Sequence, residues 1–234
     1  AETKRVVGPC SEYVVRPDSF EGVVPKIVVH EGDRVEVGDA LFVDKNYPEV
    51  KFASTISGTV KAVERGERRK ILGIKLQADE VQKYHDFGQR NVASLSADEV
   101  KNALLEAGLF GFVYQLPYAV STNPQTTPKA IFVSALRDMP LSGNFEFELQ
   151  GNEQDFQTGL TALSKLGKTY LGIGKEQKAN ALLNAKDVEV TIFDGPCQAG
   201  NVGVQVNHIA PVNKGEVVWT VDPTFVIFFG RLFN

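Results

Sequence analysis

The sequence has few of the residues from which metal and redox centres are built. Cys10 and Cys197 are the only cysteines among 234 residues, and neither lies in a C-x-x-C pair. An iron–sulfur cluster or a structural zinc site would therefore lack a recognisable ligand set. The three histidines, His30, His85 and His208, do not have the spacing of a metal site either. We expect them to lie on the surface or to form ordinary hydrogen bonds.

Long apolar runs and an excess of basic residues are also missing. The longest apolar run, Phe225 to Gly230, is far shorter than the roughly 20 residues that cross a bilayer, so we expect no transmembrane segment. The formal net charge of −4 argues against nucleic acid as a partner. The one basic cluster, Arg65 to Lys70, is interleaved with acidic residues and is interpreted as a solvated turn or as a contact with another protein of a complex.

The two ends of the chain and its length are used to predict the cellular compartment and the number of domains. No signal peptide or transit segment is recognised at the start, which together with the few cysteines predicts a reducing, cytoplasmic compartment. The chain begins without methionine and ends in an apolar run, so we expect both ends to be cut from a longer protein. Its length allows two modest domains.

Short β-rich runs separated by glycine turns fill the first third of the sequence. The strand candidates are Val23 to Val29, Ala40 to Val43, Val50 to Thr55, Thr59 to Val63 and Ile71 to Leu76. Turns are expected at Gly32-Asp33, Gly38-Asp39 and Ser57-Gly58, and Gly58 is expected to have a positive φ. This spacing predicts a compact barrel.

The barrel pattern resembles the biotinyl/lipoyl-type module, in which a G-D-x-V-x-x-G-D-x-L run precedes a lysine-bearing hairpin. Gly32 to Leu41 matches that run, and Ser54 to Val60 matches the S-x-x-S-G-x-V run that follows. Asp44-Lys45 lies where a carrier lysine is sought, but Asn46 to Glu49 makes a longer, proline-held loop. We therefore interpret Lys45 as a solvated lysine, with a soluble carrier-type module as an alternative.

From about Tyr84 the hydrophobic period changes from two to nearly four, which marks a second domain. Ser96 to Glu99 forms a capping box that begins a helix through Ala107, and Asp222-Pro223 begins a final apolar helix. Between them, strands and helices alternate over Lys129 to Ala135, Phe156 to Leu166, Thr169 to Ile173, Lys175 to Asn184 and Val188 to Phe193. This alternation predicts a parallel sheet with helices on its faces, a Rossmann-like unit.

A nucleotide site would need glycines directly after a strand, and the sequence contains no G-x-G-x-x-G or Walker motif. Gly172-x-Gly174, followed by Lys175, is the nearest candidate and is interpreted as a strand-exit turn. A free-standing nucleotide-binding domain stays open as an alternative. A second group of glycines, from Gly195 to Gly203, follows the strand that ends at Phe193. That is the end of a parallel strand at which ligands bind.

Both halves together resemble the A subunit of the sodium-translocating NADH:quinone oxidoreductases, and more distantly the C subunit of the Rnf complex and the NADH-binding flavoprotein of complex I. The matching segments are Glu31 to Leu72, Leu104 to Gly111, Lys129 to Gly143, Phe193 to Gly203 and Val226 to Phe233. The resemblance implies an α+β and α/β chain, with a lipoyl/biotinyl-like barrel-sandwich module at residues 1–83 and a C-terminally truncated Rossmann-like α/β domain at residues 84–234.

The resemblance also implies a function. It is that of a peripheral subunit, on the cytoplasmic face of the bacterial inner membrane, in a respiratory complex that couples electron transfer from NADH to ubiquinone with sodium transport. The flavins and the iron–sulfur centre are expected on partner subunits, and this chain is expected to contribute to assembly and to be inactive alone. Cys197 stands where the family commonly has a histidine, so no proton-transfer role is expected in that loop.

Flavin-binding relatives carry a glycine-rich loop at the position of residues 110–118. Bulky side chains occupy these positions here, so we expect no FMN or NADH on this chain. Phe110, Phe112, Tyr114 and Tyr118 are predicted to form an apolar wall with a polar rim that suits a quinone ring. The alternative is that these aromatic rings only fill the vacated cofactor cleft.

Overall fold

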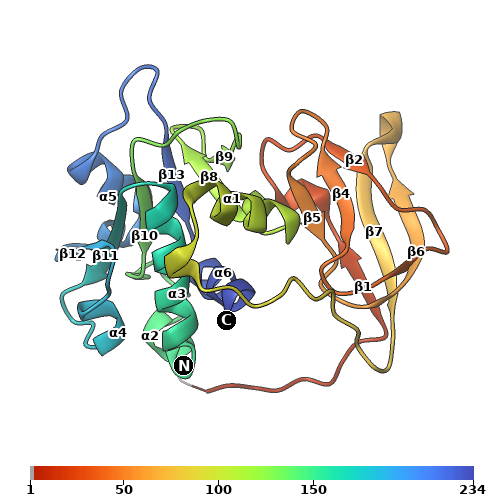
Figure 1. The fold of residues 1–234 in the computed structure, drawn as a ribbon, viewed down its shortest axis with the longest axis horizontal. Helices are drawn as coiled ribbons and strands as arrows, with labels where there is room; N and C mark the ends of the chain where they lie inside the picture. Colours follow the sequence, from red (N-terminus) through yellow and green to blue (C-terminus); the bar gives the residue numbers. More distant parts are fainter. Residues whose placement is uncertain (1–2) are drawn as a thin grey trace. The chain divides into compact units, whose positions relative to one another are not determined.

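A computed structural model describes residues 3–234, the side chain of Arg69 excepted. Residues 1 and 2 of the predicted first domain lie outside the described residues. The chain forms two compact units (Figure 1). The barrel unit comprises Lys4–Phe87 and Ala103–Gly111, and the α/β unit includes Gly88–Asn102 and Phe112–Asn234.

The barrel unit contains two antiparallel sheets. A four-stranded sheet has the order β1-β7-β6-β3, and a three-stranded sheet has the order β2-β4-β5. The elements are β1 (Glu12–Val15), η1 (Pro17–Ser19), β2 (Pro25–Ile27), β3 (Arg34–Val35), β4 (Ala40–Asp44), β5 (Lys51–Ala53), β6 (Gly58–Arg65), η2 (Glu67–Arg69) and β7 (Ile71–Ala78). All five predicted strands are present. Gly32 and Gly38 have positive φ values of 93° and 103°, as the expected Gly-Asp turns require.

The barrel core is aromatic as well as aliphatic. The rings of Phe42 and Phe52 stack with centroids 4.5 Å apart, and Phe20 lies 4.4 Å from Phe52. Gly111, from the second segment of this unit, lies against the ring of Phe52, where a Cβ atom would collide with it. The buried Phe110 precedes it. The segment Ala103–Gly111 thus belongs to the barrel core although it lies beyond the first 87 residues.

The prediction of a positive φ at Gly58 was wrong. Gly58 is the first residue of β6, in extended backbone, and is paired with Ala78 on β7. Glycine is required at this position for another reason. Any other residue would bring a Cβ atom into collision with the backbone carbonyl oxygen of Gln77. The glycine permits close approach of two strands rather than a turn.

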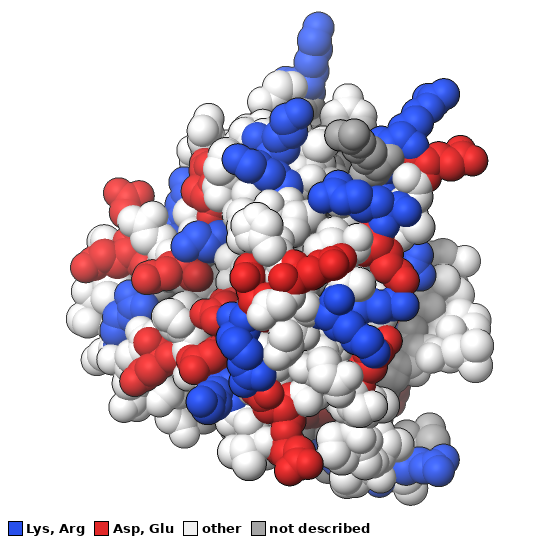
Figure 2. All heavy atoms as spheres, turned by 90° about the vertical axis from the view of Figure 1, so that its right-hand side faces the viewer, with Lys and Arg blue, Asp and Glu red and all other residues white. Residues whose placement is uncertain are grey.

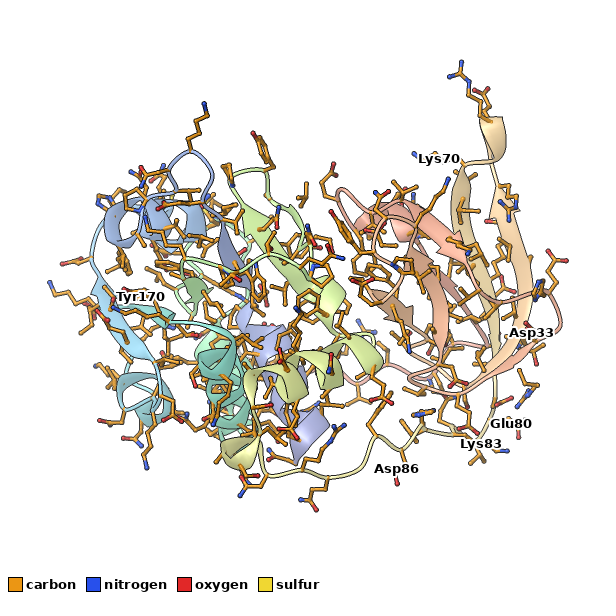
Figure 3. The ribbon with its side chains drawn as sticks, turned by 45° about the horizontal axis from the view of Figure 1, so that its top comes forward. Asp33, Lys70, Glu80, Lys83, Asp86 and Tyr170 are labelled. Carbon is orange, nitrogen blue, oxygen red and sulfur yellow. The ribbon has the colours of Figure 1, made fainter. Side chains whose placement is uncertain are left out.

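The predicted basic cluster, Arg65 to Lys70, is part of a surface with charges of both signs. Figure 2 shows Lys and Arg interspersed with Asp and Glu on the face that it draws. Lys70 lies between η2 and the start of β7 in the β6–β7 hairpin (Figure 3), and Gly66 donates a 2.8 Å backbone hydrogen bond to its carbonyl. The basic cluster predicted from the sequence is therefore on an exposed hairpin turn. A mixed-sign surface of this kind is typical of solvated protein.

The α/β unit is built on one six-stranded sheet of order β12-β11-β10-β13-β8-β9. Its first four strands are parallel, and β8 and β9 add antiparallel strands at one side. The strands are β8 (Val113–Leu116), β9 (Val120–Ser121), β10 (Ile131–Ser134), β11 (Thr169–Gly174), β12 (Glu189–Phe193) and β13 (Val218–Val221). The predicted strands of the second domain and their parallel pairing are confirmed.

Helices such as α3 and α5 flank this sheet, as Figure 1 shows. The helices after the barrel strands are η3 (Val92–Ser94), α1 (Ala97–Glu106), η4 (Phe110–Phe112), α2 (Phe145–Leu149), α3 (Glu153–Leu166), α4 (Asn180–Leu183), η5 (Cys197–Gly200), α5 (Val202–Ile209) and α6 (Pro223–Phe233). Helices α3 and α6 approach so closely that a Cβ on Gly159 would meet the carbonyl of Val226, and one on Gly230 would meet that of Asp155. Phe132 and the labelled Tyr170 (Figure 3) stack at 4.9 Å in a separate cluster with α5 residues.

Local capping signals were predicted correctly. Ser96 and Glu99 exchange hydrogen bonds at the start of α1, with Glu99 Oε2 accepting from the Ser96 amide at 2.8 Å. These bonds from the Ser96 amide and hydroxyl lower the pKa of Glu99. Asp222 caps α6 by accepting from the Thr224 amide at 2.9 Å.

The predicted helix from Lys175 to Asn184 was mostly wrong, because only α4 is helical there. The Gln177 side chain turns back and accepts from the Gly174 amide at 2.7 Å while donating to the Ala135 carbonyl at 3.0 Å. Glu146 accepts from the amides of Lys178 and Ala179. These bonds hold the first half of the segment in an extended turn.

Candidate functional site

A cavity of about 270 Å³ lies at the switch point of the six-stranded sheet. The chain continues from β10 to β11 on one side, whereas β13 pairs with β10 on the other side. Ligands of doubly wound folds bind at such a point, outside the carboxyl ends of the strands. The residues that line the cavity are Tyr114, Ser134, Leu136, Arg137, Gly200, Val202, Thr220, Val221, Asp222 and Pro223. The site thus combines the ends of β10 and β13 with the starts of α5 and α6.

An ion-pair network closes one wall of the cavity. Arg137 donates to Glu148 of α2 at 2.8 Å, and to Asp222 and Thr224 at the start of α6, both at 2.7 Å. Thr224 in turn donates to the other oxygen of Glu148 at 2.9 Å. The guanidinium also lies 5.4 Å from the ring centre of Phe145. One side chain, only 20% exposed, therefore joins the loop after β10 to α2 and to the start of α6, which lies 85 residues further along the chain.

A buried amide supports the opposite wall. Gln205 of α5 is fully buried and donates from Nε2 to the hydroxyl of Ser134 and to the carbonyl of Ala199, both at 2.9 Å. The Ser134 hydroxyl lies 3.1 Å from the Gly200 carbonyl. Gly172 makes room for this amide, because a Cβ there would collide with Gln205. Gly172, inside β11, therefore serves packing within the domain.

The four aromatic residues predicted to contact quinone have different surroundings. Phe110 is fully buried in the barrel unit, and Tyr118 is 80% exposed. Phe112 stacks on Phe225 of α6 with ring centroids 3.9 Å apart. Tyr114 on β8 lines the switch-point cavity. Of the four, Tyr114 alone belongs to this site, so the quinone prediction rests on it.

The segment that carries Tyr114 is an internal strand of the sheet. β8 pairs with β13 through Tyr114↔Thr220 and with β9 through Tyr114↔Ser121. Backbone groups of such a strand are directed sideways to its neighbours in the two ladders. An amide cradle for a phosphate needs instead a loop whose N–H groups converge on one point.

The nucleotide candidate at the end of β11 is occupied by the protein's own groups. The Gly174 amide donates to Gln177 Oε1, and Gly172 packs against Gln205. Lys175 donates to Asp194 Oδ2 at 2.8 Å, and this carboxylate raises the pKa of Lys175. The local geometry is that of a closed strand-exit turn.

Lys45 begins an exposed turn after β4. Its amide donates to the Val24 carbonyl at 2.8 Å, and Asn46 donates from its amide to the buried Asp44 at 2.9 Å. A bond from the Val50 amide to the Tyr47 carbonyl, also 2.8 Å, closes the rest of the loop. The side chain is solvent-exposed in this loop, as the sequence predicted.

Arg137, Ser134 and Gln205 were not predicted from the sequence. Arg137 is the third residue after the correctly predicted strand β10, and an arginine so near the end of a parallel strand is placed at the ligand end of the sheet. Gln205 gave no comparable signal, because the predicted glycine-rich loop ended at Gly203 and no helix was predicted over the rest of α5. Within the described residues there is no cluster of histidine, cysteine and acidic side chains suited to a metal, and no helix with the length and apolarity of a membrane span.

These features define a class of protein: a barrel-sandwich hybrid unit combined with a doubly wound α/β unit whose switch point holds a small, partly polar cavity. Family comparisons agree with this class. Residues 2–79 match the NqrA N-terminal barrel-sandwich hybrid domain, and residues 95–234 match the NqrA second alpha/beta domain. The chain belongs to the NqrA family.

Curated relatives are named as the A subunit of Na(+)-translocating NADH-quinone reductase. The protein of Pseudomonas aeruginosa strain UCBPP-PA14 is 33% identical over 219 residues, which is 92% of this chain and 48% of the relative. The Glaesserella parasuis protein is 34% identical over 229 residues, which is 96% of this chain and 51% of the relative. The chain therefore spans about half the length of the curated relatives it matches.

Proposed function

We propose that this chain is a peripheral part of a sodium-translocating NADH:quinone reductase, bound through partner subunits at the cytoplasmic face of the membrane. It holds no flavin, NADH or iron–sulfur centre of its own and contributes to assembly of the complex. Membership of the NqrA family supports this function, since the relatives are named as the A subunit of that reductase.

The observation that carries the proposal is the strand β8. Flavin-binding relatives are expected to have a phosphate-binding loop at this position. Here Val113–Leu116 pairs with β13 along its length, and Tyr114 and Gln115 pair with β9 as well. A backbone engaged in two ladders cannot turn its amides toward a phosphate without breaking the sheet. In this proposal the segment does not bind a cofactor phosphate. It is a strand of the sheet, and it contributes the side chain of Tyr114 to the cavity.

Quinone contact is proposed at the switch-point cavity. Its volume of about 270 Å³ is just below the usual range of ligand pockets, roughly 300 to 1,000 Å³, so it has room for a small ring. Tyr114, Thr220 and Val221 offer an aromatic ring, a hydroxyl group and an apolar surface in adjacent positions. Such a surface suits a planar ring that carries two carbonyl oxygens.

Titration with FMN and with NADH tests the cofactor part of the proposal. The purified chain should be colourless, and flavin fluorescence should be unchanged when FMN is mixed with an equal concentration of chain. NADH should likewise show no change in fluorescence. Stoichiometric binding of either molecule at micromolar concentration would contradict the proposal. Measurement of a complex I-type flavoprotein in parallel provides the positive control.

A further inference from the structure

We propose that Asp222 determines the ligand specificity of the switch-point cavity. Its carboxylate, fixed by Arg137 at the start of α6, excludes anionic ligands and restricts the cavity to uncharged ones. The inference rests on the proposed function, because an uncharged quinone ring is the ligand proposed there. The inference identifies Asp222 as the residue that would exclude molecules carrying a phosphate group from the cavity.

The carboxylate of Asp222 is held in place at the cavity wall from two sides. One oxygen, Oδ1, accepts from Arg137 Nη2 at 2.7 Å and from the Thr224 amide at 2.9 Å. The second bond occupies an N–H group at the positive end of α6. An anionic ligand approaching this helix end would have to compete with a negative charge that is already bound.

The charge balance around Arg137 leaves no excess positive charge for a ligand. One guanidinium faces two carboxylates, Glu148 at 2.8 Å and Asp222 at 2.7 Å. Both terminal nitrogens of the guanidinium donate within this network, Nη1 to Glu148 and Nη2 to Asp222 and Thr224. The group therefore carries a net charge of about −1 at neutral pH. A phosphate that entered the cavity would meet repulsion, while an uncharged ring would not.

The test is an anion titration of the 234-residue chain followed by backbone amide NMR, with inorganic pyrophosphate as the probe. Asp222→Asn is the main variant, because asparagine caps a helix as well as aspartate does but carries no charge. We expect pyrophosphate to shift the Thr224 and Ser134 amide signals of the variant with an affinity at least about tenfold higher than in the unsubstituted chain.

Glu148→Gln removes the second carboxylate and leaves the α6 cap intact, so it tests the inference if Asp222→Asn does not fold. It should also raise the affinity for pyrophosphate. Asp98→Asn, which removes one negative charge from the exposed first turn of α1, is the matched control and should have no effect at Thr224.

The inference would be overturned if the unsubstituted chain and both folded variants had the same pyrophosphate affinity, measured at the Thr224 amide. This result does not depend on quinone, which is measured separately in the whole complex. Failure of the quinone proposal and failure of the charge-exclusion proposal are therefore distinguishable.

Discussion

Tyr114 on β8 lies directly opposite Thr220 on β13, and both residues line the cavity at the switch point of the sheet. The pairing exists because Val113–Leu116 forms the strand β8 beside β13. Under the proposed function, this strand takes the place of a phosphate-binding loop, and Tyr114 lines the cavity instead.

The contact between α3 and α6 should not tolerate a side chain at Gly159. Gly159→Ala places a methyl group against the Val226 carbonyl, which is helix backbone and cannot rotate away. We expect a loss of unfolding free energy of about 2 kcal/mol or more, measured by urea denaturation. Gly195→Ala is the control, because its Cβ would meet only the Ala199 methyl at 3.7 Å. Equal stability of the two variants would contradict the observed helix packing.

Gly58→Ala should also destabilise the chain, because of close strand packing that the sequence did not reveal. The new methyl group would displace the Gln77 carbonyl and so open the β6–β7 pairing. A loss of about 1 to 3 kcal/mol is expected in thermal or chemical unfolding. Gly66→Ala in the same hairpin meets only the flexible Leu72 side chain at 3.2 Å and should cost less. If Gly66→Ala proves the more damaging change, the two strands are not as close as the structure places them.

Acid should weaken the barrel unit through Asp79. Arg34 donates to both oxygens of this carboxylate, at 2.9 and 2.7 Å, and this pairing lowers the pKa of Asp79 below its ordinary value. A lowered folded-state pKa contributes stability above the ordinary aspartate value of about 3.9, and this stability is lost as the pH falls through the lowered pKa.

Asp79→Asn should therefore reduce the urea midpoint at pH 7, and its difference from the unsubstituted chain should shrink as the pH falls below about 4. Glu80→Gln, an exposed neighbour, serves as the control and should follow the unsubstituted chain. A stability difference for Asp79→Asn that stays constant from about pH 7 to about pH 3 would show that the Arg34 pair does not contribute in this way.

Arg137→Met should loosen the α/β unit. The variant leaves Glu148 and Asp222 without their shared cation, and the expected cost is about 1 to 3 kcal/mol. Hydrogen exchange should locate the effect in the first turn of α6 and in α2, the segments that Arg137 joins. Lys214→Met, at an exposed position, is the charge-matched control. Uniform exchange throughout the unit would contradict a local role for the network.

Features with local signals were predictable from the sequence, whereas features made by distant segments were not. The Ser96–Glu99 capping box and the Asp222 cap depend on residues only two or three positions apart, and both were predicted. Strand β1 was missed because its partner, β7, is far away in the sequence, in the register Glu12↔Gln77. Helix propensity after β11 was overridden by Gln177, whose side chain bonds to Ala135 across the sheet.

The candidate site divides in the same way. The parallel sheet followed from the alternation of strands and helices, but its switch point depends on β13, which was not predicted. Tyr114 was identified from its position where flavin-binding relatives are expected to have a glycine-rich loop. Phe110 belongs to the barrel unit and is buried there, and Tyr118 is exposed. The hydrophobic periodicity of the sequence does not encode either of these surroundings. Arg137 acquires its role only when α2 and the start of α6 come together.

The proposal with the widest consequences is that this chain lacks a flavin site and instead contacts quinone from the switch-point cavity. Photolabelling of the whole complex with a photoreactive quinone analogue is the decisive measurement. We expect labelling within residues 110–118, suppressed by excess native quinone and reduced in a complex carrying Tyr114→Ala. Tyr118→Ala, at the exposed turn, is the control and should label normally. Labelling confined to the other proteins of the complex, with unchanged quinone affinity in the Tyr114→Ala complex, would contradict the proposal.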